Sequence, residues 1–135
     1  AIWASQERLA DAAYQATTQA FVQASLKGWI YCRDNAQACA DIITANGSKL
    51  GASHQLWMMN EVNKLIWPSP MGVGVVDPAL WDQTVAVAMG TKNLDGVAII
   101  SAAPDAEAYT DTYAKAADAA LEAEGLSWPA PHSNC

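Results

Sequence analysis

Residues that begin or end helices occur at short intervals along this chain of 135 residues, and they constrain its fold more than any other feature. Asp and Asn cap helix N-termini, Gly adopts the left-handed conformation after a C-terminus, and Pro cannot continue a helix. Between these signals, apolar residues recur at spacings of three and four, the period of one helical face. The signals stand at Asp34-Asn35, Asn46-Gly47, Pro68, Asp77-Pro78, Gly90 and Gly125. The chain is therefore predicted to be mainly α.

The predicted helices cover about residues 12–33, 35–46, 53–67, 78–90 and 104–124, with Ser53 and Asp77 as N-caps. A single helical turn is expected after Ser5, whose hydroxyl accepts from nearby backbone N–H groups. The periodic apolar residues define the faces expected to point inward. They are Phe21, Val22, Ser25, Leu26, Trp29 and Ile30; Ala38, Cys39, Ile42 and Ile43; Leu56, Met59, Val62, Leu65 and Ile66; Leu80, Trp81, Thr84, Val85 and Ala88; and Tyr109, Tyr113, Ala116, Ala117 and Leu121.

Two short apolar runs stand apart from the helices. Residues 1–4 fit the end of a strand, and residues 97–100 fit a short strand or a buried turn. Neither run has a partner strand in the sequence. The two therefore look like pieces of a sheet whose other strands are absent, in a chain without linkers or repeats.

The charge balance excludes several classes of partner. Seven Lys and Arg residues against fourteen Asp and Glu residues give a formal net charge of −7. Phosphate backbones and anionic lipid surfaces would be repelled, so no nucleic-acid partner is expected. No stretch approaches the roughly 18 apolar residues of a membrane span, so no direct membrane insertion is expected. The chain starts at Ala1 with no Met and no signal-type core, so we expect either that a leader has been removed or that the chain begins inside a longer protein.

The residues of common catalytic and metal sites are scattered. His54 and His132 are far apart in sequence, and no His or Cys pair has metal-ligand spacing. No nucleophile motif or phosphate-binding glycine loop is present. The sequence therefore predicts no metal, no cofactor and no catalytic residue, and both histidines are expected to be exposed or capping.

The cysteines are more informative. Cys32 falls in the last turn of the first predicted helix and Cys39 in the first turn of the next, with a tight corner at Asp34-Asn35 between them. Folding one helix back beside the other can bring the two Cβ atoms within disulfide range, although two buried free thiols are the alternative. A disulfide would indicate maturation in an oxidising compartment. Cys135 would then be a terminal free thiol or be paired outside this chain.

The tryptophans divide into two groups. Trp29, Trp57 and Trp81 occupy helical positions and are expected in the core. Trp67 precedes Pro68 at a helix end beside a rigid loop, where an indole could stack on a ligand, with Asn60 and Asn63 supplying amide hydrogen bonds. The alternative is that both amides tie down the loop of residues 68–74, since buried amides usually bond backbone groups.

A family resemblance is carried most specifically by residues 55–70 (QLWMMNEVNKLIWPSP) and 72–81 (GVGVVDPALW). Residues 21–29 (FVQASLKGW) and the helix around residues 109–121 add to it. The chain resembles the solute-binding proteins of ABC transporters in the thiamine-pyrimidine-precursor group, which is related to the nitrate, sulfonate and taurine binders.

The resemblance implies a two-lobed α/β protein of the type II periplasmic class, located in the periplasm or otherwise outside the cytoplasm, lipid-anchored in a Gram-positive-type cell. Residues 1–135 would be the C-terminal part of one lobe. A small planar heterocycle, such as a thiamine-pyrimidine precursor or a flavin-like solute, would bind between the lobes and pass to a membrane permease. Most ligand-contacting positions of the family would lie outside this chain.

Two other functions stay open from the sequence. A stand-alone helical interaction module would show an apolar patch where the sheet should continue, and that patch could be closed by dimerisation. An enzyme is the third class, because pyrimidine synthases of the same fold use a histidine-containing site. Neither His54 nor His132 lies in a recognisable motif, so a non-enzymatic binder is the expected function.

Overall fold

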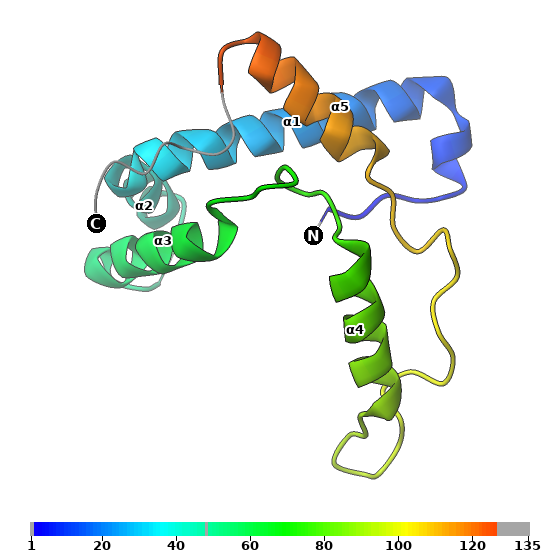
Figure 1. The fold of residues 1–135 in the computed structure, drawn as a ribbon. Helices are drawn as coiled ribbons and strands as arrows, with labels where there is room; N and C mark the ends of the chain where they lie inside the picture. The colour runs from blue at the N-terminus through cyan, green and yellow to red at the C-terminus, as the bar shows by residue number, and fades with distance from the viewer. Residues whose placement is uncertain (1, 48, 127–135) are drawn as a thin grey trace.

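The computed structural model describes residues 2–47 and 49–126 and is mainly helical, as predicted. A short 3₁₀ turn, η1 (Arg8–Ala10), precedes α1 (Ala12–Asp34), α2 (Ala36–Ala45), α3 (Ala52–Ile66), α4 (Pro78–Gly90) and α5 (Thr112–Ala123). Figure 1 shows α5 lying across α1, with α2 and α3 side by side near the C-terminal end of α1. α4 projects away from the other helices.

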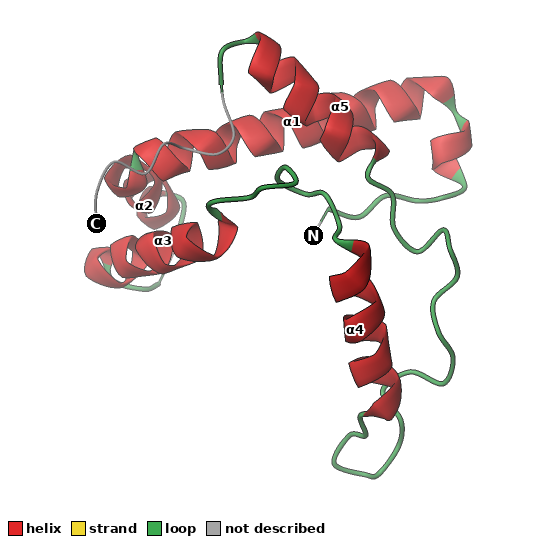
Figure 2. Cartoon of the chain, in the orientation of Figure 1, coloured by secondary structure: helices red, strands yellow, loops and turns green. Residues whose placement is uncertain are grey.

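The described residues contain no strand, only an isolated bridge between Lys92 and Ala98 (Figure 2). The prediction of a strand or buried turn at residues 97–100 is therefore wrong, and Val97 and Ile99 are 61% and 59% exposed. Residues 2–4 are irregular, and Ala1 lies outside the described part. A strand needs a neighbour to satisfy its backbone hydrogen bonds, and these segments find none among the described residues.

Side-chain caps are present at the starts of two of the described helices, α1 and α4. The Asp11 carboxylate accepts from the backbone N–H of Tyr14 at 2.9 Å and begins α1. The Asp77 carboxylate accepts from two backbone N–H groups of α4, so this predicted cap is confirmed. The cap predicted at Ser53 is wrong, because extended Gly51 precedes the helix and its carbonyl accepts from Gln55 at 3.1 Å.

The last helix starts eight residues later than its predicted start at residue 104, with Thr112 as its first residue. The Asp105 side chain accepts from the backbone N–H of Glu107 at 3.1 Å, and the Asp105 carbonyl accepts from Ala108 at 3.2 Å. An aspartate that bonds its own neighbouring backbone favours a local turn over a helix. Tyr109 consequently lies before the helix rather than on its inner face.

The core lies where α1, α5 and the end of α3 meet. α1 contributes a stripe of residues spaced four apart, and α5 contributes Ala117 and Leu121, both fully buried. Gln19 reaches from α1 to the Tyr113 carbonyl at 3.2 Å. The buried members of this cluster are Val22, Leu26, Ile30, Trp67, Ala117 and Leu121.

Several residues predicted to be inward are exposed. The buried stripe of α1 is narrower than its apolar stripe, so Phe21 is 61% and Trp29 38% exposed. Trp57 on α3 is 56% exposed, against the prediction that it belongs to the core. The same holds for Ile42, Ile43, Leu65, Leu80, Thr84 and Ala116. No described segment packs on these faces, because α1 packs mainly on α5 and α2 mainly on α3.

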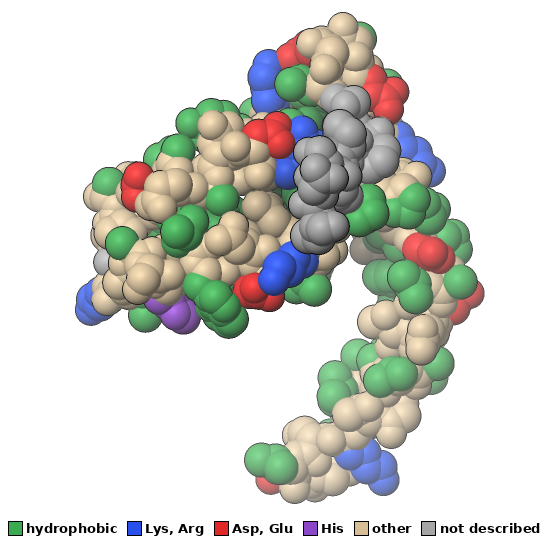
Figure 3. Space-filling model, turned by 60° about the vertical axis from the view of Figure 1, so that its left-hand side comes forward, with side chains coloured by type: hydrophobic (Ala, Val, Ile, Leu, Met, Phe, Trp, Pro, Cys, Tyr) green, Lys and Arg blue, Asp and Glu red, His purple; other side chains and the backbone are tan. Residues whose placement is uncertain are grey.

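α4 and residues 91–104 form an arm that leaves the rest of the structure (Figures 1 and 3). No residue of α4 is buried. Trp81, another tryptophan expected in the core, is half-buried at the base of the arm, where its ring lies 4.7 Å from that of Tyr109. Of the predicted inner face of this helix, Leu80 and Thr84 are exposed, whereas Trp81, Val85 and Ala88 are only partly buried.

Candidate functional site

The corner between α1 and α2 contains the cysteine pair that the sequence predicted, together with a side-chain hydrogen bond across the turn. The sulfur atoms of Cys32 and Cys39 are 2.00 Å apart and the Cα atoms 5.5 Å, so the predicted pair lies at disulfide distance. The Asn35 side chain donates to the Tyr31 carbonyl at 3.0 Å and closes the turn. Cys135 lies outside the described residues.

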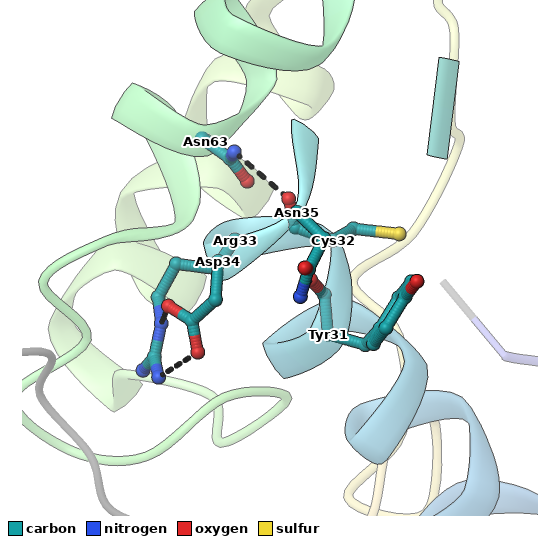
Figure 4. A network of polar contacts seen from close by, with 6 residues as sticks. All are labelled: Tyr31, Cys32, Arg33, Asp34, Asn35 and Asn63. Carbon is teal, nitrogen blue, oxygen red and sulfur yellow. Dashed lines mark hydrogen bonds and ion pairs between the residues drawn. The ribbon is translucent and has the colours of Figure 1, made fainter. Parts of the chain in front are cut away.

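Arg33 and Asp34 form a two-point ion pair at this corner (Figure 4). Arg33 Nε and Nη2 donate to the two Asp34 carboxylate oxygens at 2.7 and 2.8 Å. These bonds hold the pKa of the Asp34 carboxyl below its usual range and raise the pKa of Arg33. The Arg33 guanidinium carbon also lies 5.0 Å from the centre of the Trp67 ring, within cation–π range.

Trp67, the predicted stacking residue, is only 5% exposed and belongs to the core cluster. Arg33 covers its ring from the α1 side. A ligand would have to displace this packing to reach the face of the indole. The contact between Trp67 and a ligand thus stays a prediction that this packing does not favour.

Asn63 and Asn60 are separated by their positions on α3. Asn63 is half-buried, and its Nδ2 lies 3.5 Å from the Cys32 carbonyl, so it links α3 to the end of α1 rather than to the 68–74 loop (Figure 4). Its Oδ1 is buried without a hydrogen-bond partner in the described part. Asn60 is exposed. The structure thus joins Asn63 to Trp67 only through the backbone, where the Trp67 N–H donates to the Asn63 carbonyl at 2.9 Å, and it leaves Asn60 on the surface.

A second candidate site, which the sequence did not reveal, lies between α5 and the loop after Trp67. A cleft of about 280 Å³ is lined by Asp118 and Glu122 on α5 and by residues 69–72. Asp118 is only 8% exposed, although the predicted inner face of this helix contained no charged residue. Position 118 belongs to the buried face of residues 114, 117, 118 and 121, so helical spacing could have shown it.

The environment of Asp118 disfavours the charged form of its carboxyl group. Its Oδ1 is buried without a hydrogen-bond partner among the described residues. Burial, reinforced by the nearby negative charge of Glu122, raises the pKa of Asp118 to about 6. Lys115 also lines the cleft, and its Nζ lies 3.3 Å from a carboxylate oxygen of Asp111.

Metal and membrane sites do not emerge from the described residues. They contain no group of three His, Cys, Asp or Glu side chains that could hold a metal ion. His54 is exposed, 5.9 Å from the Trp57 ring, and His132 lies outside the described residues. Among the described helices, none has the length and apolar content to cross a bilayer.

No family model, curated protein or solved structure matches the chain.

Proposed function

We propose that the chain is part of one lobe of the solute-binding component of an ABC importer. The solute would be a small planar heterocycle, such as a thiamine-pyrimidine precursor or a flavin-like compound, held between two lobes. Residues 1–135 would supply the C-terminal helices of an α/β lobe, in line with the sequence resemblance at residues 55–81. The observation that carries the structural side of this proposal is the uncovered apolar surface of the arm.

α4 has the composition of a buried helix. With about 3.6 residues per turn, its large apolar residues spread over more than half of its circumference. Leu80 and Val87 are nonetheless 60% and 62% exposed. A helix that is apolar on most sides is normally buried in a larger protein. We therefore expect α4 to pack against a further segment, and a parallel sheet flanked by helices is the arrangement that the resemblance implies.

The segment after α4 supports the same expectation. Asn93 donates to the Val97 carbonyl at 2.8 Å, and Ile99 donates to Thr91 at 3.1 Å, so residues 91–99 make a small extended turn. The apolar side chains of Val97 and Ile99 stay exposed. A short paired segment with apolar side chains and a free edge is suited to join a sheet. In the proposed lobe, residues 97–100 would lie against such a sheet.

The cysteine pair and the net charge are compatible with this proposal. Two cysteines at disulfide distance are compatible with an extracytoplasmic protein, because disulfides persist in oxidising environments. A periplasmic or other extracytoplasmic solute carrier need not bind polyanions, so a net charge of −7 is compatible with this function. A membrane permease would be its protein partner.

The uncovered arm is also the feature expected of a stand-alone helical module that pairs with a second copy. The two functions differ in what covers α4. Self-association predicts a dimer of the 135-residue chain, whereas the proposed lobe predicts that the longer protein covers α4 within one molecule.

Solute binding is tested by thermal unfolding of the whole product of the reading frame that contains residues 1–135. The panel would contain aminopyrimidines, flavins, sulfonates and polyamines. A planar heterocycle at about 100 times its Kd should raise the Tm by roughly 5 °C or more. The 135-residue chain alone should not respond to that heterocycle, because the second lobe is required. If no heterocycle in the panel changes the Tm of the whole product, the proposed function is wrong.

A further inference from the structure

The cleft beside α5 differs from the uncovered arm because it is built from described residues on both sides. Asp118, Ala119 and Glu122 line it from α5, and Ser69, Pro70 and Met71 line it from the loop. Its volume of about 280 Å³ is at the small end of the range for ligand pockets. A ligand of this size would be a small molecule rather than a peptide.

Gly72 allows the loop to approach the Asp118 carboxylate closely. Its φ of +98° is a backbone conformation that residues with a side chain rarely adopt. A Cβ at this position would stand 2.2 Å from Asp118 Oδ2, closer than any real contact. The loop backbone therefore packs against Asp118 Oδ2, and Asp118 remains among the residues that line the cleft.

The cleft contains more hydrogen-bond acceptors than donors that are free to bond them. The Ser69 hydroxyl donates to the Gly72 carbonyl at 2.9 Å, and the Lys115 ammonium is paired with Asp111. Asp118 Oδ1 is left without a donor among the described residues, and the Glu122 carboxylate lies one helical turn away on the same side. A buried carboxylate without a hydrogen-bond donor is costly. Rotation of the carboxylate toward the cleft would let a ligand with N–H donors and positive charge reach Asp118 and remove that cost.

The chemistry of the walls narrows the class of ligand. Anions are disfavoured by two carboxylates. A bare Ca²⁺ needs six to eight oxygen ligands, and the described residues contain no group of three metal-ligating side chains. Pro70, Met71 and Ala119 give the cleft apolar walls, which suit an alkyl or aryl group. An organic ammonium ion meets all of these conditions.

We infer that the cleft between α5 and residues 69–72 binds a small organic ammonium ion, which donates N–H hydrogen bonds to the Asp118 and Glu122 carboxylates. The site lies within the described residues and does not depend on the proposed solute-binding function. Of the charged side chains, Asp118, Glu122 and Lys115 line the cleft, and the loop side contributes none. Protonation of Asp118 should therefore weaken binding as the pH falls through about 6, the raised pKa of this group.

The test is a titration of the ¹⁵N-labelled 135-residue chain with n-butylammonium chloride at constant ionic strength, followed by NMR. Tetramethylammonium is the matched ligand control, because it carries the same charge without an N–H donor. Asp118→Asn and Glu122→Gln are the test variants. Asp82→Asn on exposed α4 is the matched protein control, because it removes the same charge far from the cleft.

Butylammonium should shift the amide signals of Gly72, Lys115 and Asp118 in a saturable manner at pH 7.5. Asp118→Asn should weaken binding at least tenfold and Glu122→Gln several-fold, whereas Asp82→Asn should leave the Kd within twofold. Tetramethylammonium should bind at least tenfold more weakly than butylammonium. Equal shifts with tetramethylammonium or with Na⁺ would show a general ionic effect and overturn the inference. Unchanged binding by both Asp118→Asn and Glu122→Gln would overturn it as well, and if Asp118→Asn fails to fold, Glu122→Gln alone decides.

Discussion

Replacing Gly72 by alanine tests the close approach between the loop and Asp118. The φ of +98° makes any L side chain unfavourable, at a cost of about 1–2 kcal/mol. The added Cβ would also meet Asp118 Oδ2 at 2.2 Å and Val75 Cγ2 at 3.3 Å. Overpacking of this kind costs about 1–3 kcal/mol, and Asp118 can relieve part of it by rotating toward the cleft. We expect Gly72→Ala to lower the free energy of unfolding by about 2–4 kcal/mol.

Gly125→Ala is the matched control. Gly125 has a φ of +81°, but nothing lies within 4 Å of its added Cβ. Gly125→Ala should therefore show the backbone cost without the contact, about 1–2 kcal/mol. Urea unfolding followed by tryptophan fluorescence measures both variants, provided that the m-value stays constant. The difference between them, about 1–2 kcal/mol, is assigned to the contact with Asp118.

A double-mutant cycle shows whether Asp118 is responsible. In an Asp118→Ala background the carboxylate is gone, so the excess cost of Gly72→Ala should largely disappear. If Gly72→Ala costs no more than Gly125→Ala, or if the excess survives the loss of the Asp118 side chain, the described packing of the loop on α5 is wrong.

Three further predictions concern the core, the corner and pH. Leu121→Ala should lower the free energy of unfolding by about 3–5 kcal/mol because Leu121 is fully buried. Leu65→Ala should change it by less than about 0.5 kcal/mol because Leu65 is 87% exposed. Equal effects of the two variants in urea titrations would contradict the described packing of the core. Replacing Cys32 and Cys39 by serine should lower the free energy of unfolding by at most about 2–3 kcal/mol, because the loop that a disulfide would close is short. The intact mass of the native chain should rise by about 2 Da on reduction, and no change in mass would show that both thiols are free. Because the pKa of Asp118 is raised to about 6, the unfolded state loses this proton first, so stability should fall as the pH rises from below 3.8 through about 6. Asp118→Asn should flatten that dependence in urea titrations between pH 4 and 7.5; an unchanged slope would refute this assignment.

The helices could be predicted because their signals are local. The Asp77 carboxylate caps α4 whatever surrounds it, and an apolar stripe spaced by three and four residues favours a helix at residues 12–33 without knowledge of its partners. The Cys32–Cys39 pairing is local too, since the two cysteines are seven positions apart in the sequence, on either side of one tight turn. These features depend on residues that are neighbours in the sequence, so the sequence alone is sufficient to predict them.

Burial was harder to predict because it depends on what packs against a helix. Phe21, Trp29 and Leu26 share one apolar face, but α5 covers only Leu26 fully. Asp118 shows the opposite case, because its position belongs to the buried face of α5 but its side chain is charged, so the apolar pattern did not include it. The helix predicted at residues 104–111 does not form, because the Asp105 side chain bonds the nearby backbone and stabilises a turn instead. Helix propensity does not include this side-chain bond.

Trp67 illustrates the limit for a candidate site. Its position before Pro68 correctly indicates a helix end, since α3 stops at Ile66. The sequence could not show that Arg33 from the end of α1 lies over the indole ring, because this contact requires the path of the chain between the two helices. Loop-adjacent position alone therefore does not distinguish a ligand-stacking tryptophan from a core residue.

Amide hydrogen exchange of α4 tests most directly whether the arm belongs to a larger solute-binding lobe. The 135-residue chain and the whole product of its reading frame would be compared by mass spectrometry, with peptides covering residues 79–90, at a concentration where both are monomeric. The proposed function predicts fast exchange of these amides in the chain and exchange at least a hundredfold slower in the whole product, because α4 is covered there. Equally fast exchange in both proteins would contradict the proposal, since α4 would then be exposed in the complete molecule as well.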